Sequence, residues 1–296
     1  MYYNQGIVPM VKEKPICSII IPFFNEEARV LRVLRVVKRL KRSVPIICVD
    51  DGSTDAAAET IQKRYKDIVL LHHQKNIGKS AAVCTGLARV KTPFVMLLDA
   101  DLKNLKASEL DDAIETIETY PTIAMLVLRR KNEALVSKMV RGDVLVSGER
   151  IIRTSDLRNV MKTHPVAYEI EPAINYYMME KQKRVCWMFH SGTNTIKINK
   201  IGFFEGMKKE IQYVYSVLVY KGPVVQAKSM LFFCRNNVSN DRPGMQDVVL
   251  KKFDEYATLL SRYARAEIPV DQLLSRKFYK ETVLPRTKKQ LRKLLE

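Results

Sequence analysis

Short apolar runs alternate with amphipathic stretches along the first half of the chain. In the first run, at residues 16–21, apolar side chains occupy both faces, which is typical of a strand buried on both sides. The stretch at 30–40 instead repeats its apolar residues at helical spacing, with Arg and Lys on the other face. Further strands are predicted at residues 45–49, 68–71, 94–98, 123–128 and, with a weaker pattern, 184–189.

The order of these elements predicts the fold class. A strand followed by a helix, repeated several times, gives an α/β fold with a mostly parallel sheet and helices on both faces. Ligands of such sheets bind beyond the carboxyl ends of the strands. Polar segments follow three of the predicted strands, at residues 22–26, 50–55 and 99–101. We therefore expect these segments to meet in one crevice. Pro22 should end the first strand, and Asn25 should cap the helix after it.

Composition indicates an ordinary globular protein with an unusual charge. The 296 residues are 47% hydrophobic and 28% charged, so the chain can bury a sizeable core. Its five cysteines are scattered, and Cys17, Cys48 and Cys186 lie in apolar runs, which favours free thiols in a reducing compartment. The N-terminal residues lack the apolar core of a signal peptide, and no run reaches the length of a membrane span. A cytoplasmic protein is expected, either free or peripheral on a membrane.

The net charge of +18 is concentrated in the last third of the chain. Residues 197–296 hold 20 basic and 10 acidic side chains, which contribute +10. Such an excess attracts anionic lipid, phosphorylated ligands or nucleic acid, although a solvated basic surface accounts for it equally well. The pattern predicts a catalytic domain at residues 14–200 and a basic, amphipathic, partly helical extension at 201–296.

Two carboxylates follow the fourth predicted strand. Asp99 and Asp101 are separated by one residue, so both can turn toward one hard cation such as Mg²⁺ or Mn²⁺. A cation at this position would stabilise the charge of a departing nucleoside diphosphate. The alternative is that an aspartate at a strand end merely caps the next helix.

Two other polar segments suit a nucleotide. Asp50 or Asp51 can accept hydrogen bonds from a base or a ribose, as carboxylates at strand ends do, although a turn with a helix cap would look the same. In the segment 22–26, an aromatic ring such as that of Phe24 can border a base and Glu26 can bind it.

The segment 76–80 contains the Gly-Lys-Ser ending of a phosphate-binding loop. That loop also requires a glycine five positions before Gly78, where this chain has His73, so the motif fails. Lys79, at a predicted helix start, remains a candidate for binding an anion.

The succession of these segments resembles family 2 glycosyltransferases of the GT-A fold. The likeness rests on Ile-Ile-Ile-Pro-Phe-Phe-Asn-Glu-Glu, Val-Asp-Asp-Gly-Ser-Thr-Asp, Lys-Asn-Ile-Gly-Lys and Leu-Leu-Asp-Ala-Asp-Leu, and it covers residues 14–104 closely. Residues 147–153 are similar to the Ser-Gly-Phe-Arg segment of the branch that contains dolichol-phosphate mannose synthase. Glu149 stands where that branch has an aromatic residue.

The resemblance implies a role for each matching residue. A nucleotide-sugar donor, UDP- or GDP-hexose, would be held with Mg²⁺ or Mn²⁺, and the metal would bind Asp99 and Asp101. Arg129 or Arg130, with Arg150 and Arg153, would face the acceptor or the phosphates, and Lys197 and Lys200 would close over the diphosphate. The nucleoside would lie against Pro22, Phe24, Glu26 and Asp51.

The expected reaction is an inverting hexose transfer to a polyprenyl phosphate or to a sugar hydroxyl of a glycan or glycolipid. A lipid phosphate is already anionic and needs Arg for docking, whereas a hydroxyl needs a carboxylate as general base. Glu149 is the favoured base, and an ion-paired carboxylate beside Arg150 is the alternative for it. The other candidate bases are Asp143, Glu169 and Glu171.

Two other classes of protein fit less well. Nucleotidyltransferases usually have a glycine-rich loop after the first strand, where this chain has Pro22-Phe23-Phe24-Asn25-Glu26. A nucleic-acid-binding protein would explain the charge, but the sequence contains no recognised binding motif, and its basic residues alternate with acidic and apolar ones.

Overall fold

The structure is a computed structural model that describes residues 14–130, 147–165 and 170–193, together with five positions of a later helix, Val225, Lys228, Ser229, Phe232 and Phe233. The strands are β1 (Cys17–Phe23), β2 (Ile46–Asp50), β3 (Val69–His72), β4 (Phe94–Leu97), β5 (Met125–Arg130), β6 (Arg150–Arg153) and β7 (Val185–His190). The helices are α1 (Glu27–Val37), α2 (Ala57–Arg64), α3 (Lys79–Leu87), α4 (Ala107–Thr119), α6 (Thr154–Met161) and α7 (Ile170–Glu180).

The strands form one seven-stranded sheet in the order β3-β2-β1-β4-β6-β5-β7. Every neighbouring pair is parallel except the two pairs that involve β6. The predicted α/β fold with a mostly parallel sheet is therefore confirmed. β6 is the strand that the sequence pattern did not predict, because its four residues, Arg-Ile-Ile-Arg, are too few to show a period.

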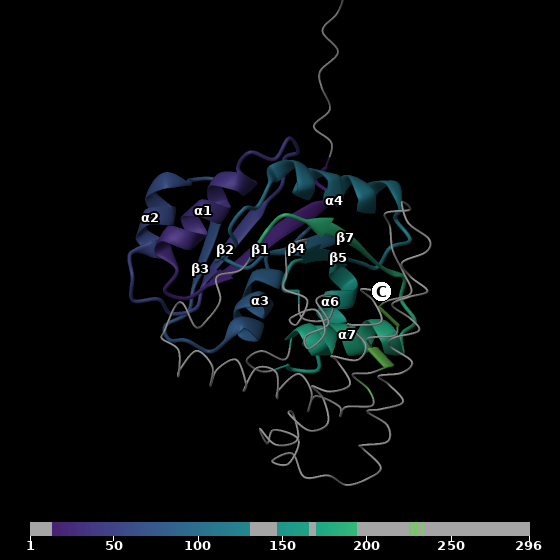
Figure 1. Ribbon diagram of the computed structural model, residues 1–296. Helices are drawn as coiled ribbons and strands as arrows, with labels where there is room; N and C mark the ends of the chain where they lie inside the picture. Colours follow the sequence, from purple (N-terminus) through teal and green to yellow (C-terminus); the bar gives the residue numbers. More distant parts are fainter. Residues whose placement is uncertain are drawn as a thin grey trace, which may run out of the picture.

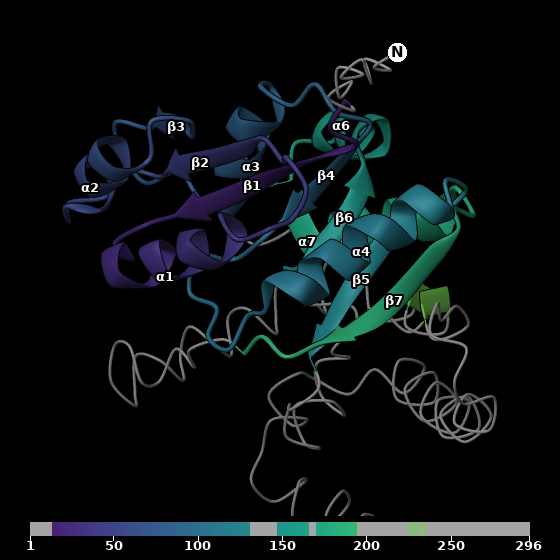
Figure 2. The same cartoon turned by 90° about the horizontal axis from the view of Figure 1, so that it is seen from above.

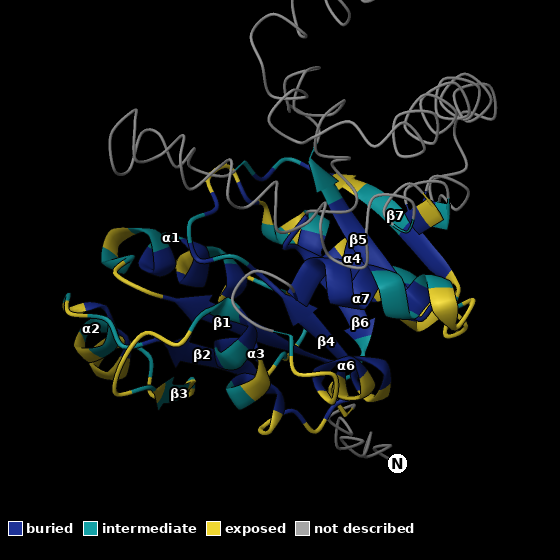
Figure 3. Ribbon diagram, turned by 90° about the horizontal axis from the view of Figure 1, so that it is seen from below, coloured by how far each residue is buried: buried dark blue, intermediate teal, exposed yellow. Residues whose placement is uncertain are grey.

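Helices cover both faces of the sheet (Figures 1 and 2). α1, α2 and α4 pack on one face, in an apolar cluster that includes Ile19 and Ile21 of β1. α3, α6 and α7 pack on the other face, in a second cluster that includes Ile20. Successive side chains of a strand point to opposite faces, so the apolar run of β1 supplies both clusters. The interior of the sheet is fully buried (Figure 3).

Two local predictions around β1 are wrong. Pro22 does not end the strand: it pairs with Val49 in the register of β1 and β2, and the strand continues to Phe23. Asn25 does not cap α1, because its backbone has a φ of 52° and its side-chain oxygen accepts a hydrogen bond from the Thr54 N–H. Asp55 takes the capping role, since it accepts a hydrogen bond from the Glu27 N–H at the start of α1.

The direction of β6 decides which residues reach the functional edge of the sheet. The carboxyl ends of β1, β2 and β4 lie at this edge. Because β6 is antiparallel to β4, its first residue, Arg150, pairs with Leu97 at the carboxyl end of β4. Its last residue, Arg153, pairs with Phe94 at the opposite edge.

Four cysteines lie in the described residues, and all four are free thiols, as predicted. Cys17, Cys48 and Cys186 are buried, and burial raises the pKa of the Cys48 thiol to about 12. In the part of the chain that the structure describes, no helix has the length and apolar character to cross a bilayer. Nearly all of residues 201–296 lie outside the described part, so the division into a catalytic domain and a basic extension stays a prediction.

Candidate active site at the carboxyl edge of the sheet

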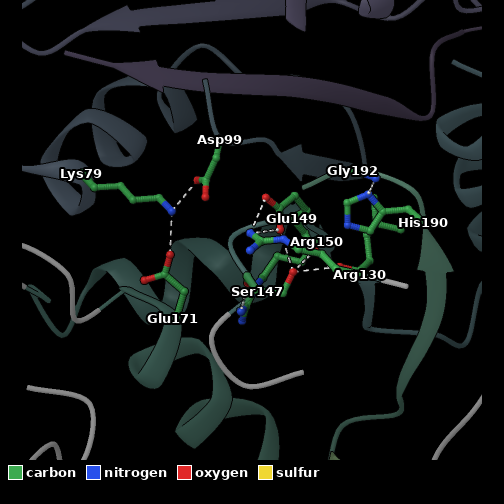
Figure 4. A network of polar contacts seen from close by, with 10 residues as sticks. Lys79, Asp99, Arg130, Ser147, Glu149, Arg150, Glu171, His190 and Gly192 are labelled. Atoms are coloured by element: carbon green, nitrogen blue, oxygen red, sulfur yellow. Dashed lines mark hydrogen bonds and ion pairs between the residues drawn. The ribbon is translucent and has the colours of Figure 1, made fainter. Parts of the chain in front are cut away.

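Asp99 lies just beyond the carboxyl end of β4 and contacts a partly buried ammonium group. The Lys79 Nζ, at the first residue of α3, lies 2.6 Å from the Asp99 Oδ1. The same Nζ lies 2.7 Å from the Oε1 of Glu171, in the first turn of α7 (Figure 4). The anion that Lys79 meets in this structure is therefore a pair of carboxylates supplied by the chain itself.

Lys79 remains charged in this position. Burial alone would lower the pKa of its ammonium group, but the two neighbouring carboxylates, Asp99 and Glu171, together raise that pKa well above its ordinary value. An ammonium group has three N–H donors, and the two carboxylates take two of them. One donor is therefore left for a further oxygen ligand.

Gly148 brings a turn of the chain directly against Asp99. A Cβ atom built on Gly148 would lie 2.6 Å from each carboxylate oxygen of Asp99, closer than real contacts allow. Only glycine lets the backbone approach the carboxylate this closely. The segment Ser147-Gly148-Glu149, which was singled out from the sequence, thus forms one wall of the space around Asp99.

Glu149 is fully buried and paired with a cation. Its two oxygens accept hydrogen bonds from the Arg130 Nη2 at 2.9 and 3.0 Å, and its Oε2 also accepts one from the Ser147 Oγ at 2.8 Å (Figure 4). This is the ion-paired alternative that the sequence left open, with Arg130 as the partner in place of Arg150. The carboxylate is therefore poorly placed to act as a general base.

Arg150 is also fully buried. Its Nε donates a hydrogen bond to the Ser147 carbonyl at 2.9 Å, and its Nη1 donates one to the Asn175 Oδ1 on α7 at 3.0 Å. The expectation that the Arg150 side chain faces an acceptor does not fit this position, because its guanidinium group holds the turn before β6.

Asp101 is half-buried on the loop that follows Asp99. Two residues later, Lys103 and Thr193 exchange two backbone hydrogen bonds, of 2.8 and 2.9 Å. Ser191 is also held, because its N–H and Oγ donate hydrogen bonds to the two carboxylate oxygens of Glu109, at the start of α4. The segment after β7 therefore lies alongside the loop that carries Asp101.

Asp51 binds its own chain. Its Oδ1 contacts the His73 Nδ1 at 2.7 Å and accepts a hydrogen bond from the Ile77 N–H, and its Oδ2 accepts one from the Gly78 N–H at 2.8 Å. With both oxygens engaged and the residue 4% exposed, the expected direct contact with a nucleoside does not fit this structure. Asp51 instead fixes the loop that begins α3 and presents Lys79.

The residues of β1 and the loop after it that were predicted to hold the nucleoside fit that role to different degrees. The Phe24 ring is 41% exposed, which suits the predicted stacking against a base. Glu26 forms an ion pair with Arg29, so its carboxylate is at least partly occupied. Pro22 is buried within β1, two residues before Phe24.

The two predicted arginines outside this network lie at opposite edges of the sheet. Arg129, at the carboxyl end of β5, stacks over the rings of Trp187 and Phe189, with its guanidinium carbon 4.5 and 5.5 Å from their centroids. Arg153 stacks over Phe94 and donates a hydrogen bond to the Pro121 carbonyl at the amino edge of β4. The prediction that Arg153 faces phosphates or an acceptor is wrong, because the antiparallel β6 carries it away from Asp99.

The remaining candidates, Lys197, Lys200, Asp143 and Glu169, lie outside the described residues. Conversely, the structure adds Asn175 and Gly148 to the site, neither of which was assigned a role from sequence. The sequence contains a pattern that could have identified Asn175, because Glu171 and Asn175 are polar residues one helical turn apart in an otherwise apolar segment. For Gly148, the close approach depends on tertiary structure alone.

Comparison with known proteins relates the chain to a family of enzymes. The sequence pattern of glycosyl transferase family 2 matches residues 18–196, more than half of the chain. An undecaprenyl-phosphate 4-deoxy-4-formamido-L-arabinose transferase from Pseudomonas paraeruginosa is 36% identical over 95 residues, which are 29% of this chain and 28% of the relative. A dolichyl-phosphate β-glucosyltransferase from Trichomonas vaginalis is 30% identical over 131 residues, 40% of this chain and 38% of the relative. The matches thus span less than half of either relative.

The fold also has solved counterparts. Glucosyl-3-phosphoglycerate synthase from Mycobacterium tuberculosis, in a crystal with Mn²⁺, uridine diphosphate and phosphoglyceric acid, superposes with a TM-score of 0.56. The superposition covers 74% of this chain and 80% of that one, at 15% identity, so the likeness concerns the fold alone. Together with the matched pattern over residues 18–196, the order of elements and the polar edge of the sheet lead to one conclusion: the chain belongs to glycosyl transferase family 2.

Proposed function

We propose that the chain is a metal-dependent, inverting glycosyltransferase that moves a hexose from a UDP- or GDP-sugar to a polyprenyl phosphate. The position of Asp99 is the observation that supports a site for the nucleotide-sugar donor. Asp99 lies beside the charged Lys79 and against the Gly148 turn, and Asp101 is two residues away. Carboxylates for a cation and an ammonium for a phosphate thus lie at one edge of the sheet, where ligands of α/β sheets bind.

Asp99 and Asp101 suit a hard divalent cation. Within the described residues, no three His, Cys, Asp or Glu side chains gather into a complete metal site. Mg²⁺ and often Mn²⁺ bind through one or two carboxylates, with the remaining ligands supplied by substrate phosphates and water. The two aspartates would therefore hold Mg²⁺ or Mn²⁺ together with the donor diphosphate, and the bound cation would act as a Lewis acid toward the leaving group. The crystallised M. tuberculosis relative contains Mn²⁺ and UDP, which supports this reading.

Lys79 supplies the second positive charge for the donor. As the bond between the sugar C1 and the diphosphate oxygen breaks, the diphosphate gains negative charge, and an ammonium group that is already in place stabilises it without reorganisation. The N–H of Lys79 that neither carboxylate takes is available to a diphosphate oxygen. Phe24, exposed on the loop after β1, offers an aromatic ring to the base.

The pairing of Glu149 favours an anionic acceptor. Glu149 is bound to Arg130, and Glu171 is bound to Lys79, so each of these candidate bases already neutralises a cation. A phosphate oxygen needs no base: it attacks C1 on the face opposite the diphosphate, the new C–O bond forms as the old one breaks, and no proton moves. The two relatives named above are an undecaprenyl-phosphate and a dolichyl-phosphate sugar transferase, which supports a polyprenyl phosphate here. A sugar hydroxyl is the second candidate, with Asp143 or Glu169 as base.

Ligand-dependent thermal stability tests the donor. The chain is heated with each nucleoside diphosphate and nucleotide sugar, with and without Mn²⁺. A ligand at 100 times its dissociation constant stabilises a fold by about 2.7 kcal/mol, a readable shift in melting temperature. Metal-dependent stabilisation by UDP or GDP is expected, and no shift with any nucleotide would overturn the donor site.

Transfer from the donor so identified to undecaprenyl phosphate or to a glycolipid hydroxyl then tests the acceptor. Transfer to the lipid phosphate alone is expected. Transfer to the hydroxyl alone would replace the favoured acceptor by the second one.

A further inference from the structure

We infer that helix α7 braces the donor site, and that Glu171 is a positioning residue that acts through Lys79. This inference rests on the proposed function, because it assigns Lys79 to the donor diphosphate. Glu171 neither contacts Asp99 nor faces the reacting atoms in this account. Its role is to fix where the ammonium group of Lys79 lies.

Two carboxylates fix the position of the Lys79 ammonium group. A lysine side chain has four rotatable bonds and holds one position only when partners fix it. Here the Nζ lies between two carboxylates, 2.6 Å from Asp99 and 2.7 Å from Glu171. The Glu171 side chain is only 6% exposed, and its Oε1 is committed to this contact. Without Glu171, the ammonium group would have Asp99 as its sole carboxylate partner among the described residues.

A second set of contacts from α7 reaches the turn that lies against Asp99. Asn175, one turn after Glu171, accepts a hydrogen bond from the Arg150 Nη1, and the Arg150 Nε donates to the Ser147 carbonyl. Gly148, the next residue, lies against the Asp99 carboxylate. α7 therefore reaches Asp99 by two routes, through Lys79 (Figure 4) and through the turn at 147–148.

α7 is suited to this task because it is a rigid element. Four of its apolar residues are buried in the core cluster on one face of the sheet: Ile170, Ala173, Ile174 and Met178. Side chains that orient the ligands of a bound metal typically cost about 10- to 100-fold in affinity or activity when they are lost. The same effect is expected for Glu171 on the affinity for the donor.

The experiment measures binding of UDP and GDP with Mn²⁺ by titration calorimetry to the wild-type chain and to Glu171→Gln. The matched control is Asp156→Asn on α6. The Asp156 side chain is 4% exposed, against 6% for Glu171. Its Oδ1 lies 3.0 Å from the Lys183 Nζ and accepts a hydrogen bond from the Tyr177 hydroxyl at 3.0 Å. Its other oxygen, like that of Glu171, is buried with no hydrogen-bond partner among the described residues. Both variants remove the charge of a buried carboxylate that pairs with a lysine, but only Glu171→Gln should bind the nucleotide about 10- to 100-fold more weakly.

A double variant separates positioning from general damage. If Glu171 acts through Lys79, then Lys79→Met with Glu171→Gln binds the nucleotide no more weakly than Lys79→Met alone. In the transfer assay, Glu171→Gln should raise the KM for the donor and leave the KM for the acceptor unchanged. Wild-type affinity in Glu171→Gln, or an additive loss in the double variant, overturns the inference alone. Absence of nucleotide binding to the wild-type chain overturns it together with the proposed donor site.

Discussion

At the scale of single residues, the site depends on how closely other groups approach Asp99. Its carboxylate has the Lys79 ammonium on one side and the Gly148 backbone on the other. Glycine is required at 148 because of the lack of space, and the charge of Lys79 offsets that of the carboxylate.

Gly148→Ala should therefore weaken the donor site. The added methyl group would lie 2.6 Å from both Asp99 oxygens, so either the carboxylate or the turn must move. Overpacking of this kind costs about 1–3 kcal/mol of the free energy of unfolding. We expect that loss in urea unfolding, together with weaker Mn²⁺-dependent nucleotide binding in calorimetry.

Gly86→Ala is the matched control for this substitution. Its methyl group would meet the Ile20 side chain at 2.9 Å, inside the core and away from Asp99. It should lower stability and leave nucleotide affinity unchanged. Equal affinity in the two alanine variants would show that the Gly148 contact has no part in donor binding.

Asp101→Ala tests the cation site directly. Asp101 is only half-buried, so its loss should leave the fold intact, as circular dichroism can verify. A cation that stabilises the leaving group contributes several kcal/mol to the transition state, and each 1.36 kcal/mol is a factor of ten in rate. The transfer rate at saturating Mn²⁺ should fall by at least about 100-fold. Unchanged turnover would refute the assignment of the metal to this residue.

At the scale of elements, loops that follow neighbouring strands hold one another in place. Asn25, after β1, exchanges hydrogen bonds with Ser53 and Thr54, after β2. Asp51, after β2, binds the backbone that begins α3. The functional edge is therefore a set of mutually supported turns, and a change in one loop should be detectable in the next.

Asp51→Asn should loosen the start of α3. The amide group has one acceptor oxygen, whereas the carboxylate serves the Ile77 N–H, the Gly78 N–H and the His73 ring. A buried donor left without its partner costs about 1–3 kcal/mol. Amide hydrogen exchange at Ile77 and Gly78 should accelerate, and nucleotide affinity should fall because Lys79 follows directly. Unchanged exchange at both amides would mean that Asp51 does not hold this loop.

The sequence predicted elements well where burial sets the pattern. β1 and β4 begin within one residue of their predicted starts, since both are buried, mostly apolar runs. The prediction from sequence failed where tertiary contacts decide which residues form an element or cap it. The cap of α1 comes from Asp55, 28 residues after Glu27, and β6 is defined by its neighbours β4 and β5.

The same reasoning accounts for the outcomes at the site. Asp99 and Lys79 lie at one edge because Asp99 follows the wholly apolar strand β4 and Lys79 begins the helix α3, two elements that the sequence predicted. The Arg153 side chain was assigned to the wrong edge, and the favoured roles of Glu149 and Arg150 do not fit their positions, because the directions of these side chains depend on the antiparallel register of β6. A shift of one residue in that register would exchange the faces on which these side chains lie.

At the scale of the whole molecule, the charge of +18 has no role in the donor site as described. Residues 197–296 supply +10 of it, from 20 basic and 10 acidic side chains, and all of these residues lie beyond the matched family pattern. A polyprenyl phosphate is held in a membrane, so a protein that uses it must come to the bilayer surface. A basic surface provides that attraction where the lipids are anionic, at about 1 kcal/mol for each Lys or Arg near the surface.

The chain should therefore sediment with vesicles that contain phosphatidylserine or phosphatidylglycerol and stay in solution with pure phosphatidylcholine vesicles. Because exposed charges are screened within about 10 Å at 0.1 M salt and about 3 Å at 1 M, binding should weaken steeply as salt rises. A charge-reversal variant of residues 286–293, with Arg and Lys replaced by Glu, should lose vesicle binding while its affinity for the nucleotide in solution is retained. Equal sedimentation with neutral and anionic vesicles at high salt would instead indicate apolar insertion, and no sedimentation with either would assign the basic residues another role.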